Sequence, residues 1–496
     1  MTLDNSALYN AFVSHDARFD GVFYIGVTST GIYCRPVCTA KTPKAANCLF
    51  FASAEAAEKA AFRPCLRCRP ELAPGNAPVD DSQRIASLFV DRIENHTEQG
   101  APDDKIGLEE IAAQFALSSR QIRRIVHKEL GVSPIDLVLT RRLLLAKQLL
   151  TETSLPIIEV AFDSGFSSLR RFNDAFNSRY GMPPSRLRKE AKGTQGEKAS
   201  PETITLQLSY RPPFDWLGML GFLSMRMLKG VEQVKGNEYS RTVRMGRRKG
   251  WVRVRHVPEK HALVVEITHS LTPVLPVVLG RLRHMFDLSA RPDIISAHLM
   301  HDSILADIVA RNPGLRVPGA FDGFELAVRA ILGQQVTVKG ATTLAGRFAE
   351  AFGDPIETPY PELTHLSPTP QRVATASIEE IAALGIIRTR ARSIITLAEE
   401  VAAGRLKLEA GVQPEATIKQ LVALPGIGNW TAHYIAMRAL RWPDAFPKED
   451  IALRSRLGGV SAAQAELLSQ AWRPWRSYAT LYLWQNPVED KNTRST

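Results

Sequence analysis

Residues 421–450, LVALPGIGNWTAHYIAMRALRWPDAFPKED, decide the fold of the C-terminal half of the chain. An apolar segment runs into the glycine-rich string at 424–428, and a second apolar-periodic segment follows it. This pattern predicts a helix, a tight turn and a second helix, which is a helix-hairpin-helix. Gly426 and Gly428 allow the backbone to turn sharply and to approach a partner closely. The N–H groups that begin the second helix favour an anion such as a DNA phosphate, so both glycines are predicted DNA contacts.

The string Leu-Pro-Gly-Ile-Gly-x-Trp-Thr-Ala, followed by Phe-x-x-x-Asp, resembles the helix-hairpin-helix DNA glycosylases and, more closely, the AlkA-type 3-methyladenine glycosylases. The resemblance implies that Asp450 lies beside the anomeric carbon of a flipped-out nucleotide. A fixed carboxylate there stabilises the positive charge that develops on the sugar. Glu449 is an alternative carboxylate beside it. Trp430 stands where bifunctional relatives carry a lysine nucleophile, so the resemblance implies a monofunctional hydrolase.

Length and composition limit the number of domains, the partners and the location of the protein. A length of 496 residues predicts three to four domains. The net charge of +11 is typical of nucleic-acid-binding proteins, although many other basic proteins share it. The first residues lack the basic run and apolar core of a signal peptide, and no apolar run is long enough to span a bilayer. We expect a cytoplasmic, nucleoid-associated protein with no membrane partner.

All five cysteines fall between Cys34 and Cys68, which predicts metal or redox chemistry rather than a disulfide framework. Two close pairs, Cys34 with Cys38 and Cys65 with Cys68, have the spacing that one tetrahedral zinc ion needs. A zinc site that only stabilises a small fold is the simplest interpretation. Cys48 is predicted to be a small buried residue. The clustering also excludes the iron-sulfur cluster that some glycosylases carry after the catalytic region.

The sequence segments around these cysteines resemble the N-terminal domain of the Ada adaptive-response proteins. These segments are RFDGVFYIGVTSTGIYCRPVC at 18–38 and FRPCLRCRPE at 62–71. The resemblance covers residues 1–79 and implies that Cys34 accepts a methyl group from a DNA methylphosphotriester. Lys41 stands where relatives place an arginine for phosphate contact. Methylation would remove one negative charge facing DNA, so we expect DNA binding to become tighter.

Residues 80–189 contain an internal duplication of a helix-turn-helix unit, at 108–131 and 157–181. Each unit has a Ser-Ser pair placed to cap a second helix, and arginines follow at the start of that helix. The span resembles the AraC-type DNA-binding domain. The resemblance implies promoter DNA as a partner, RNA polymerase as a further partner of an activator, and a monomer. The predicted DNA-contacting arginines are Arg120, Arg123, Arg124, Arg170 and Arg171.

A polar run at 190–202 predicts a linker. Beyond the linker, the pattern of residues 203–292 predicts strands with a helix between them. The segment from Arg211 to Phe222 resembles the AlkA N-terminal domain. The resemblance implies that Phe222 reaches the base pocket, although an ordinary core position is an equal alternative.

Residues 293–490 have the pattern of a helical glycosylase body. The resemblance implies that Gln335 enters the duplex as a wedge. It also implies that Trp430, Tyr434 and Trp484 line the base pocket, where electron-rich rings favour a cationic alkylated purine. Ile451 stands where relatives have an aromatic residue, so one wall of the pocket is expected to be thinner.

The sequence therefore predicts a multidomain, mainly α-helical protein. It has a small zinc-bound α+β domain, an AraC-type double helix-turn-helix, a small α+β domain and a helix-hairpin-helix glycosylase domain. The predicted function joins excision of alkylated purines to methyl-triggered regulation of transcription. Two alternatives stay open: a regulator with a non-catalytic glycosylase-like scaffold, and a repair enzyme whose zinc site is purely structural.

Overall fold

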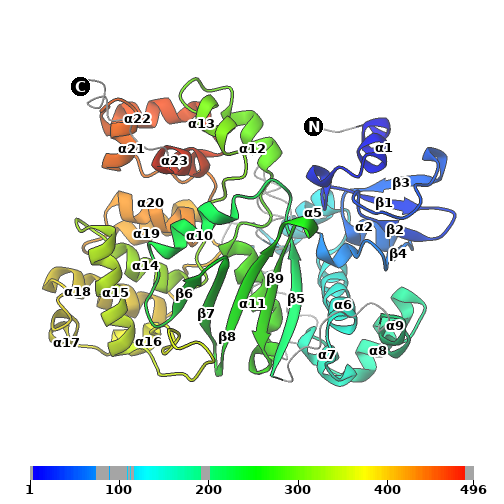
Figure 1. Cartoon of the computed structure of the whole chain (residues 1–496), viewed down its shortest axis with the longest axis horizontal. Helices are drawn as coiled ribbons and strands as arrows, with labels where there is room; N and C mark the ends of the chain where they lie inside the picture. Colours follow the sequence, from blue (N-terminus) through cyan, green and yellow to red (C-terminus); the bar gives the residue numbers. More distant parts are fainter. Residues whose placement is uncertain are drawn as a thin grey trace.

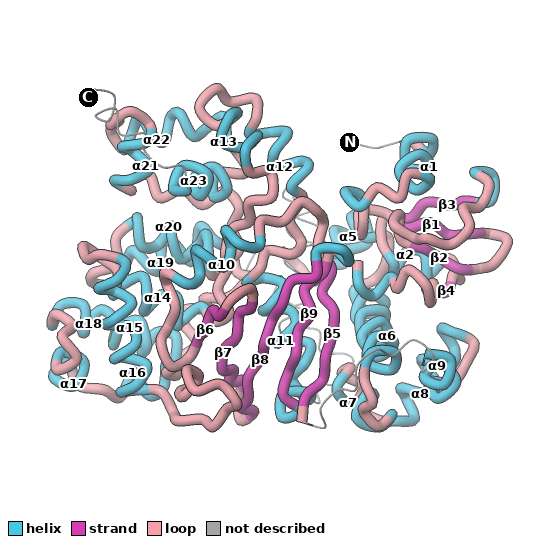
Figure 2. The backbone as a smooth tube through the Cα atoms, in the orientation of Figure 1, coloured by secondary structure: helices cyan, strands magenta, loops and turns pink. Residues whose placement is uncertain are grey.

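The computed structural model describes residues 4–73, 117–191 and 202–485, together with Phe89, Glu109 and Ala112. Most of these residues are helical, with a small sheet near the N-terminus and a larger sheet at the centre (Figure 1, Figure 2). The predicted fold class is confirmed. Most of the predicted linker lies outside the described residues, as does all but Glu109 and Ala112 of the helix expected to open the first helix-turn-helix unit. No helix within the described ranges is long and apolar enough to cross a membrane.

The N-terminal domain is built on a small four-stranded sheet. Its elements are α1 (Asn5–Val13), η1 (Ala17–Phe19), β1 (Tyr24–Val27), β2 (Ile32–Cys34), η2 (Ala45–Asn47), β3 (Cys48–Phe51), α2 (Ala54–Lys59), β4 (Arg63–Pro64) and η3 (Pro70–Leu72). The strand order is β3-β1-β2-β4, and β2 and β4 run parallel with Tyr33 opposite Pro64. The next residues along these paired strands, Cys34 and Cys65, therefore lie at the same edge of the sheet.

The helices that follow are α5 (Ser119–Leu130), α6 (Pro134–Glu152), α7 (Ile157–Asp163), α8 (Leu169–Tyr180) and α9 (Pro184–Ala191). The predicted serine caps are present. The Ser118 side chain accepts the Gln121 N–H at the start of α5, and the Ser168 side chain accepts the Arg171 N–H at the start of α8. Such caps satisfy N–H groups that a helix start otherwise leaves unpaired.

A five-stranded antiparallel sheet forms the centre of the molecule, in the order β5-β9-β8-β7-β6. Its strands are β5 (Thr203–Ser209), β6 (Glu232–Lys235), β7 (Glu238–Met245), β8 (Arg248–Val257) and β9 (Ala262–Thr268). Its helical elements are α10 (Trp216–Ser224), η5 (Pro258–Lys260), η6 (His269–Val274) and α11 (Leu275–Met285). Helix α6 lies beside the edge strand β5 in the view of Figure 1, and the Gln148 side chain donates to the Gln207 carbonyl at 3.0 Å.

Helices α6, α7 and α8 share one hydrophobic core with this sheet. Leu149 of α6, Val160 of α7 and Phe176 of α8 belong to the same buried cluster as Leu206 of β5 and Val265 of β9. Burial of apolar surface is the main stabilising contribution to folding. The helix-turn-helix part is therefore packed into the body of the protein.

The remaining residues form a helical body with its own large core. Its elements are α12 (Pro292–Leu299), α13 (Ala306–Arg311), α14 (Gly323–Leu332), α15 (Val338–Phe352), α16 (Pro370–Ala374), α17 (Ile378–Ala382), α18 (Arg388–Ala402), α19 (Pro414–Val422), α20 (Asn429–Arg438), α21 (Ile451–Arg456), α22 (Ala462–Leu468), η7 (Ser469–Trp472) and α23 (Arg476–Gln485). Helices α19 and α20 are the predicted helix-hairpin-helix.

Candidate active site and zinc centre

The hairpin turn between α19 and α20 uses its two glycines differently. Gly426 has a φ of +79°, and a Cβ atom there would lie 2.1 Å from the Ser393 Oγ of α18. Both its backbone conformation and its close approach therefore require glycine. Gly428 has ordinary backbone angles, and a Cβ atom there would meet no atom of the described residues within 4 Å. No side chain of the described residues caps α20, so its first N–H groups face outward beside Gly428 and are open to an anion.

Asp450 is the N-cap of α21 and is half-buried. Its Oδ1 accepts the Leu453 N–H at 2.7 Å and the Trp484 indole N–H at 3.1 Å. Its Oδ2 accepts the Trp430 indole N–H at 2.7 Å. Three donors from three helices therefore hold the carboxylate in one orientation. The sequence suggested only stacking faces for the two tryptophans, and the structure adds their N–H groups as partners of Asp450.

Two rings of the predicted pocket stack on α20. Trp430 and Tyr434 lie one turn apart, with ring centroids 5.4 Å apart and planes 8° from parallel. The Tyr434 ring lies 6.2 Å from that of Trp484, which is tilted by 43°. The three aromatic residues and Asp450 therefore come together at one place. Ile451, directly after Asp450, is 80% exposed and gives the site no wall in this structure.

Phe222 lies differently from the other predicted pocket residues. It is buried in the core of the helical body, and the guanidinium groups of Arg226 and Arg438 lie over its ring at 3.9 and 4.9 Å from the centroid. The structure thus gives this side chain packing and cation–π contacts. Its role in binding a base stays a prediction.

Positive charge surrounds the inner end of the aromatic stack. Arg438 donates to the Tyr434 hydroxyl at 2.7 Å and also to the Pro318 and Gly319 carbonyls. Burial by itself would raise the pKa of Tyr434, but the nearby charges of Arg438 and Arg226 outweigh it and lower that pKa. This charge opposes a cationic base, so any preference for one has to come from Asp450 and the tryptophan faces.

The predicted wedge residue, Gln335, is exposed in the turn between α14 and α15 with a φ of +53°. Its neighbour Gln334 ties this turn to the hairpin. The Gln334 side-chain amide donates to the Gly426 carbonyl and to the Thr431 hydroxyl, each at 3.0 Å. The Gln334 carbonyl accepts a hydrogen bond from Arg390 of α18. Helix α18 thus supports both loops, through Arg390 and through Ser393.

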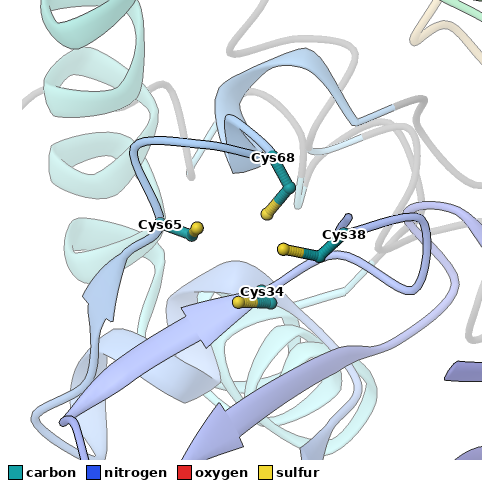
Figure 3. A group of neighbouring side chains, drawn as sticks. All are labelled: Cys34, Cys38, Cys65 and Cys68. Atoms are coloured by element: carbon teal, nitrogen blue, oxygen red, sulfur yellow. The ribbon is translucent and has the colours of Figure 1, made fainter. Parts of the chain in front are cut away.

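The four predicted zinc ligands converge at the edge of the small sheet, and Figure 3 shows their sulfur atoms pointing toward a common centre. The ligand atoms of Cys34, Cys38, Cys65 and Cys68 all lie within 4.8 Å of one another. A tetrahedral zinc with Zn–S bonds of about 2.3 Å needs sulfurs roughly 3.8 Å apart, so the group fits. Cys48 is buried, as predicted, and is not part of the group.

Cations hold the loops that carry these cysteines. Arg35 is buried, and its backbone N–H lies 3.3 Å from the Cys68 Sγ while its side chain donates to the Cys68 carbonyl at 3.0 Å. The same guanidinium pairs with buried Asp20. Lys147 of α6 pairs with Glu71 and lies 3.4 Å from the Cys65 carbonyl. The loops that carry the cysteines are therefore anchored to α6.

Four family models match the chain in succession. They are the metal binding domain of Ada (7–71), a helix-turn-helix domain (111–190), the AlkA N-terminal domain (205–322) and the HhH-GPD superfamily of base excision DNA repair proteins (328–477). Over 493 residues the chain is 37% identical to the probable bifunctional transcriptional activator/DNA repair enzyme AlkA of Mycobacterium tuberculosis, an alignment that covers 98% of this chain and 97% of that protein. The chain belongs to the bifunctional Ada/AlkA family.

Each half of this Ada/AlkA chain also matches shorter proteins. It is 37% identical over 277 residues to DNA-3-methyladenine glycosylase 2 of Escherichia coli, covering 56% of this chain and 95% of that protein. It is 30% identical over 184 residues to the bifunctional transcriptional activator/DNA repair enzyme AdaA of Bacillus subtilis, covering 37% of this chain and 82% of that protein. The resemblances to Ada and AlkA predicted from the sequence are confirmed.

The predicted DNA contacts of the Ada part all reach the surface. Lys41 is exposed, and so are the five arginines at the starts of α5 and α8, namely Arg120, Arg123, Arg124, Arg170 and Arg171. Asp174 lies 3.9 Å from Arg170, and both side chains are largely exposed. An acidic neighbour partly offsets the charge that Arg170 offers to DNA, so the second unit is expected to bind phosphate more weakly.

Proposed function

We propose that this Ada/AlkA chain removes alkylated purines from DNA by monofunctional N-glycosidic hydrolysis. The observation that supports this most strongly is the Asp450 carboxylate, which three N–H donors orient beside a stack of aromatic side chains. The outward-facing start of α20 next to Gly428 would hold a phosphate of the same strand. A lysine is absent from the hairpin position of Trp430, so no Schiff base forms there.

The reaction needs little more than a fixed negative charge. As the bond between C1′ and the base nitrogen breaks, its electron pair leaves with the base, and Asp450 stabilises the positive charge that grows on the sugar. Water then bonds to C1′, and one of its protons passes to the Asp450 carboxylate. A cationic alkylated purine leaves as a neutral base, which lowers the need for a general acid.

The test is release of free bases from methylated duplex DNA. We expect wild-type protein to release methylpurines without strand breaks, and we expect Asp450→Asn to lose nearly all of this activity while still binding DNA. Equal release by both proteins would contradict the role of Asp450 and direct attention to Glu449. A protein that binds DNA but releases nothing would support the scaffold alternative.

We propose that the Ada part transfers a methyl group from a DNA methylphosphotriester to a cysteine, with Cys34 as acceptor. The convergence of four cysteine sulfurs and the Ada family match support this. One bound zinc ion would keep these thiols deprotonated and nucleophilic. The Cys34 sulfur then attacks the methyl carbon, the carbon–oxygen bond breaks, and the DNA phosphodiester leaves with its negative charge.

The identity of the acceptor needs a direct test. Cys34 is 6% exposed, whereas Cys68 is the most exposed of the four cysteines. The experiment treats the full-length protein with stereodefined methylphosphotriester DNA and maps the methylated residue by peptide mass spectrometry. We expect the methyl group on Cys34 and no transfer to Cys34→Ser. Methylation of Cys68 would reassign the acceptor, and no transfer to the wild type would favour a purely structural zinc site.

Methylation of the cysteine is also proposed to change the affinity of the protein for DNA. Conversion of one thiolate to a thioether removes a negative charge facing DNA, so methylated protein binds its promoter more tightly. The exposed arginines of α5 and α8 make the phosphate and groove contacts, and the protein acts as a monomer that helps to recruit RNA polymerase. Footprinting with methylated and unmethylated protein tests this, and equal affinities would contradict the electrostatic argument.

A further inference from the structure

The loop that carries Asp450 is held by one helix at two places. This loop follows α20 and ends where Asp450 caps α21. The first turn of α23 contacts the loop at Asp444, and the last turn of α23 brings Trp484 to Asp450. Arg476 and Trp484 are eight residues apart, which corresponds to roughly 12 Å along a helix. Helix α23 thus sets the distance between the two contacts.

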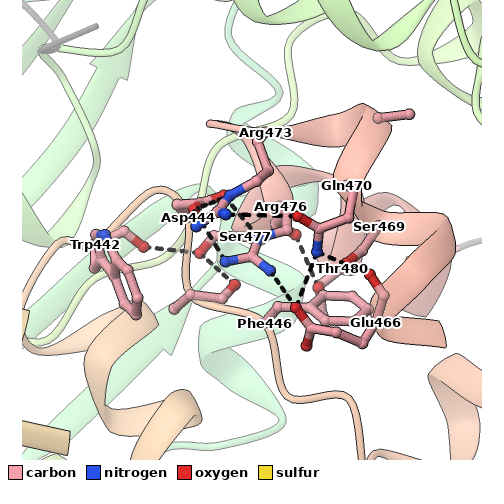
Figure 4. A network of polar contacts seen from close by, with 12 residues as sticks. Trp442, Asp444, Phe446, Glu466, Ser469, Gln470, Arg473, Arg476, Ser477 and Thr480 are labelled. Carbon is pink, nitrogen blue, oxygen red and sulfur yellow. Dashed lines mark hydrogen bonds and ion pairs between the residues drawn. The ribbon is translucent and has the colours of Figure 1, made fainter. Parts of the chain in front are cut away.

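Figure 4 shows the contact at the first turn. The Asp444 carboxylate accepts two hydrogen bonds from Arg476, at 2.7 Å from Nε and 2.9 Å from Nη2. Arg473 adds a bond at 2.8 Å, and Arg476 uses its third nitrogen for Glu466 at 3.0 Å. The Asp444 side chain is 10% exposed and that of Arg476 is 6% exposed, whereas that of Arg473 is 50% exposed.

Ser477, the next residue of α23, fixes the backbone of the same loop. Its N–H donates to the Pro443 carbonyl at 2.9 Å. Its hydroxyl lies 2.8 Å from the Trp442 carbonyl and 3.0 Å from the Ala445 carbonyl. Both the side chain of Asp444 and the backbone on either side of it are therefore tied to one helical turn.

We propose that the buried pair of Asp444 and Arg476 positions the Asp450 carboxylate for the glycosylase reaction. This inference rests on the function proposed for Asp450. A buried ion pair adds little stability compared with apolar packing, because both charges lose their hydration. A two-pronged arginine–carboxylate contact does fix geometry, and such precision matters where a carboxylate must meet a developing charge. Arg476 and Asp444 act through Asp450 and are positioning residues.

The test uses the full-length protein and single-turnover release of methylpurines. Arg476→Lys keeps the charge and removes the two-pronged contact. We expect its rate of release to fall about 10- to 100-fold, with the affinity for duplex DNA containing an uncleavable abasic-site analogue within about twofold of wild type. Arg473→Lys is the matched control, since Arg473 contacts the same carboxylate from a half-exposed position, and we expect its rate to stay within about threefold.

Two further variants separate positioning from loss of stability. Leu208→Ala in the central sheet should lower the thermal midpoint without slowing release at 25 °C, because Leu208 is buried outside the helical body. In a Trp484→Phe background, Arg476→Lys should cost much less than it does alone, since both changes act on one carboxylate. A wild-type rate in Arg476→Lys, or a loss fully additive with Trp484→Phe, would overturn the inference. No release by the wild type would instead overturn the proposed function, and this inference with it.

Discussion

Each oxygen of the Asp450 carboxylate accepts an indole N–H, from Trp484 at Oδ1 and from Trp430 at Oδ2. Hydrogen bonds to a charged acceptor contribute about 1.5–3 kcal/mol each. Trp430→Phe keeps an aromatic face and removes one donor. Since about 1.4 kcal/mol corresponds to a factor of ten in rate, we predict that Trp430→Phe slows single-turnover base release by about tenfold or more. We predict an unchanged affinity for DNA. A wild-type rate for Trp430→Phe would show that stacking is the only contribution of this side chain.

The two glycines of the hairpin between α19 and α20 allow its effect on stability to be measured separately from its effect on DNA binding. Gly426→Ala places a Cβ atom 2.1 Å from the Ser393 Oγ in a left-handed backbone conformation, so we predict a lower thermal midpoint and weaker DNA binding. The added methyl group of Gly428→Ala meets no atom in the part of the chain that the structure describes, so we predict an unchanged midpoint. Its methyl group would nevertheless obstruct a phosphate at the start of α20, which lowers DNA affinity. Thermal denaturation and DNA binding at fixed salt measure both effects, and an unchanged affinity in Gly428→Ala would contradict phosphate binding at this turn.

The sequence predicted elements whose determinants are local. The glycines predicted the hairpin, and the Ser-Ser pairs predicted where two helices begin. Each of these signals is contained within a few residues. The cysteine spacing likewise predicted a group that the parallel pairing of β2 with β4 brings together. Contacts between distant residues were not predictable in this way. Trp484 lies 34 residues from Asp450, and nothing in the local pattern of either residue indicates that the indole N–H points at the carboxylate.

A buried arginine joins parts of the protein that the sequence suggested were separate. The Arg211 side chain, which is fully buried, donates to the Asp20 carbonyl of the Ada part and to the Ser289 carbonyl of the AlkA part. Together with the core shared by α6 and the central sheet, this contact connects the two halves. The polar run at 190–202 predicted a linker, and composition alone carries no information on how the segments beside a linker pack.

The interface between the zinc domain and the helix-turn-helix predicts a dependence on pH. Glu58 of α2 pairs with Arg179 of α8 at 3.0 Å, yet burial outweighs that attraction and raises the pKa of Glu58 from 4.5 to about 7. Between these values the folded protein holds a proton that the unfolded chain has lost, so the free energy of unfolding falls as pH rises through this window. We predict that denaturant midpoints decrease from roughly pH 5 to pH 7. Glu58→Gln should flatten this decrease, and an unchanged slope in the variant would assign it to another group.

If the Asp450 carboxylate drives cleavage of the N-glycosidic bond, single-turnover release of bases from methylated duplex DNA depends on it. Wild type, Asp450→Asn and Glu449→Gln are compared, with free bases resolved by chromatography and strand breaks counted before alkali treatment. The structure predicts methylpurine release without strand breaks by the wild type and by Glu449→Gln, and a loss of at least about a hundredfold in Asp450→Asn. Wild-type release by Asp450→Asn would contradict this role of Asp450, and strand breaks before alkali treatment would contradict a monofunctional hydrolase.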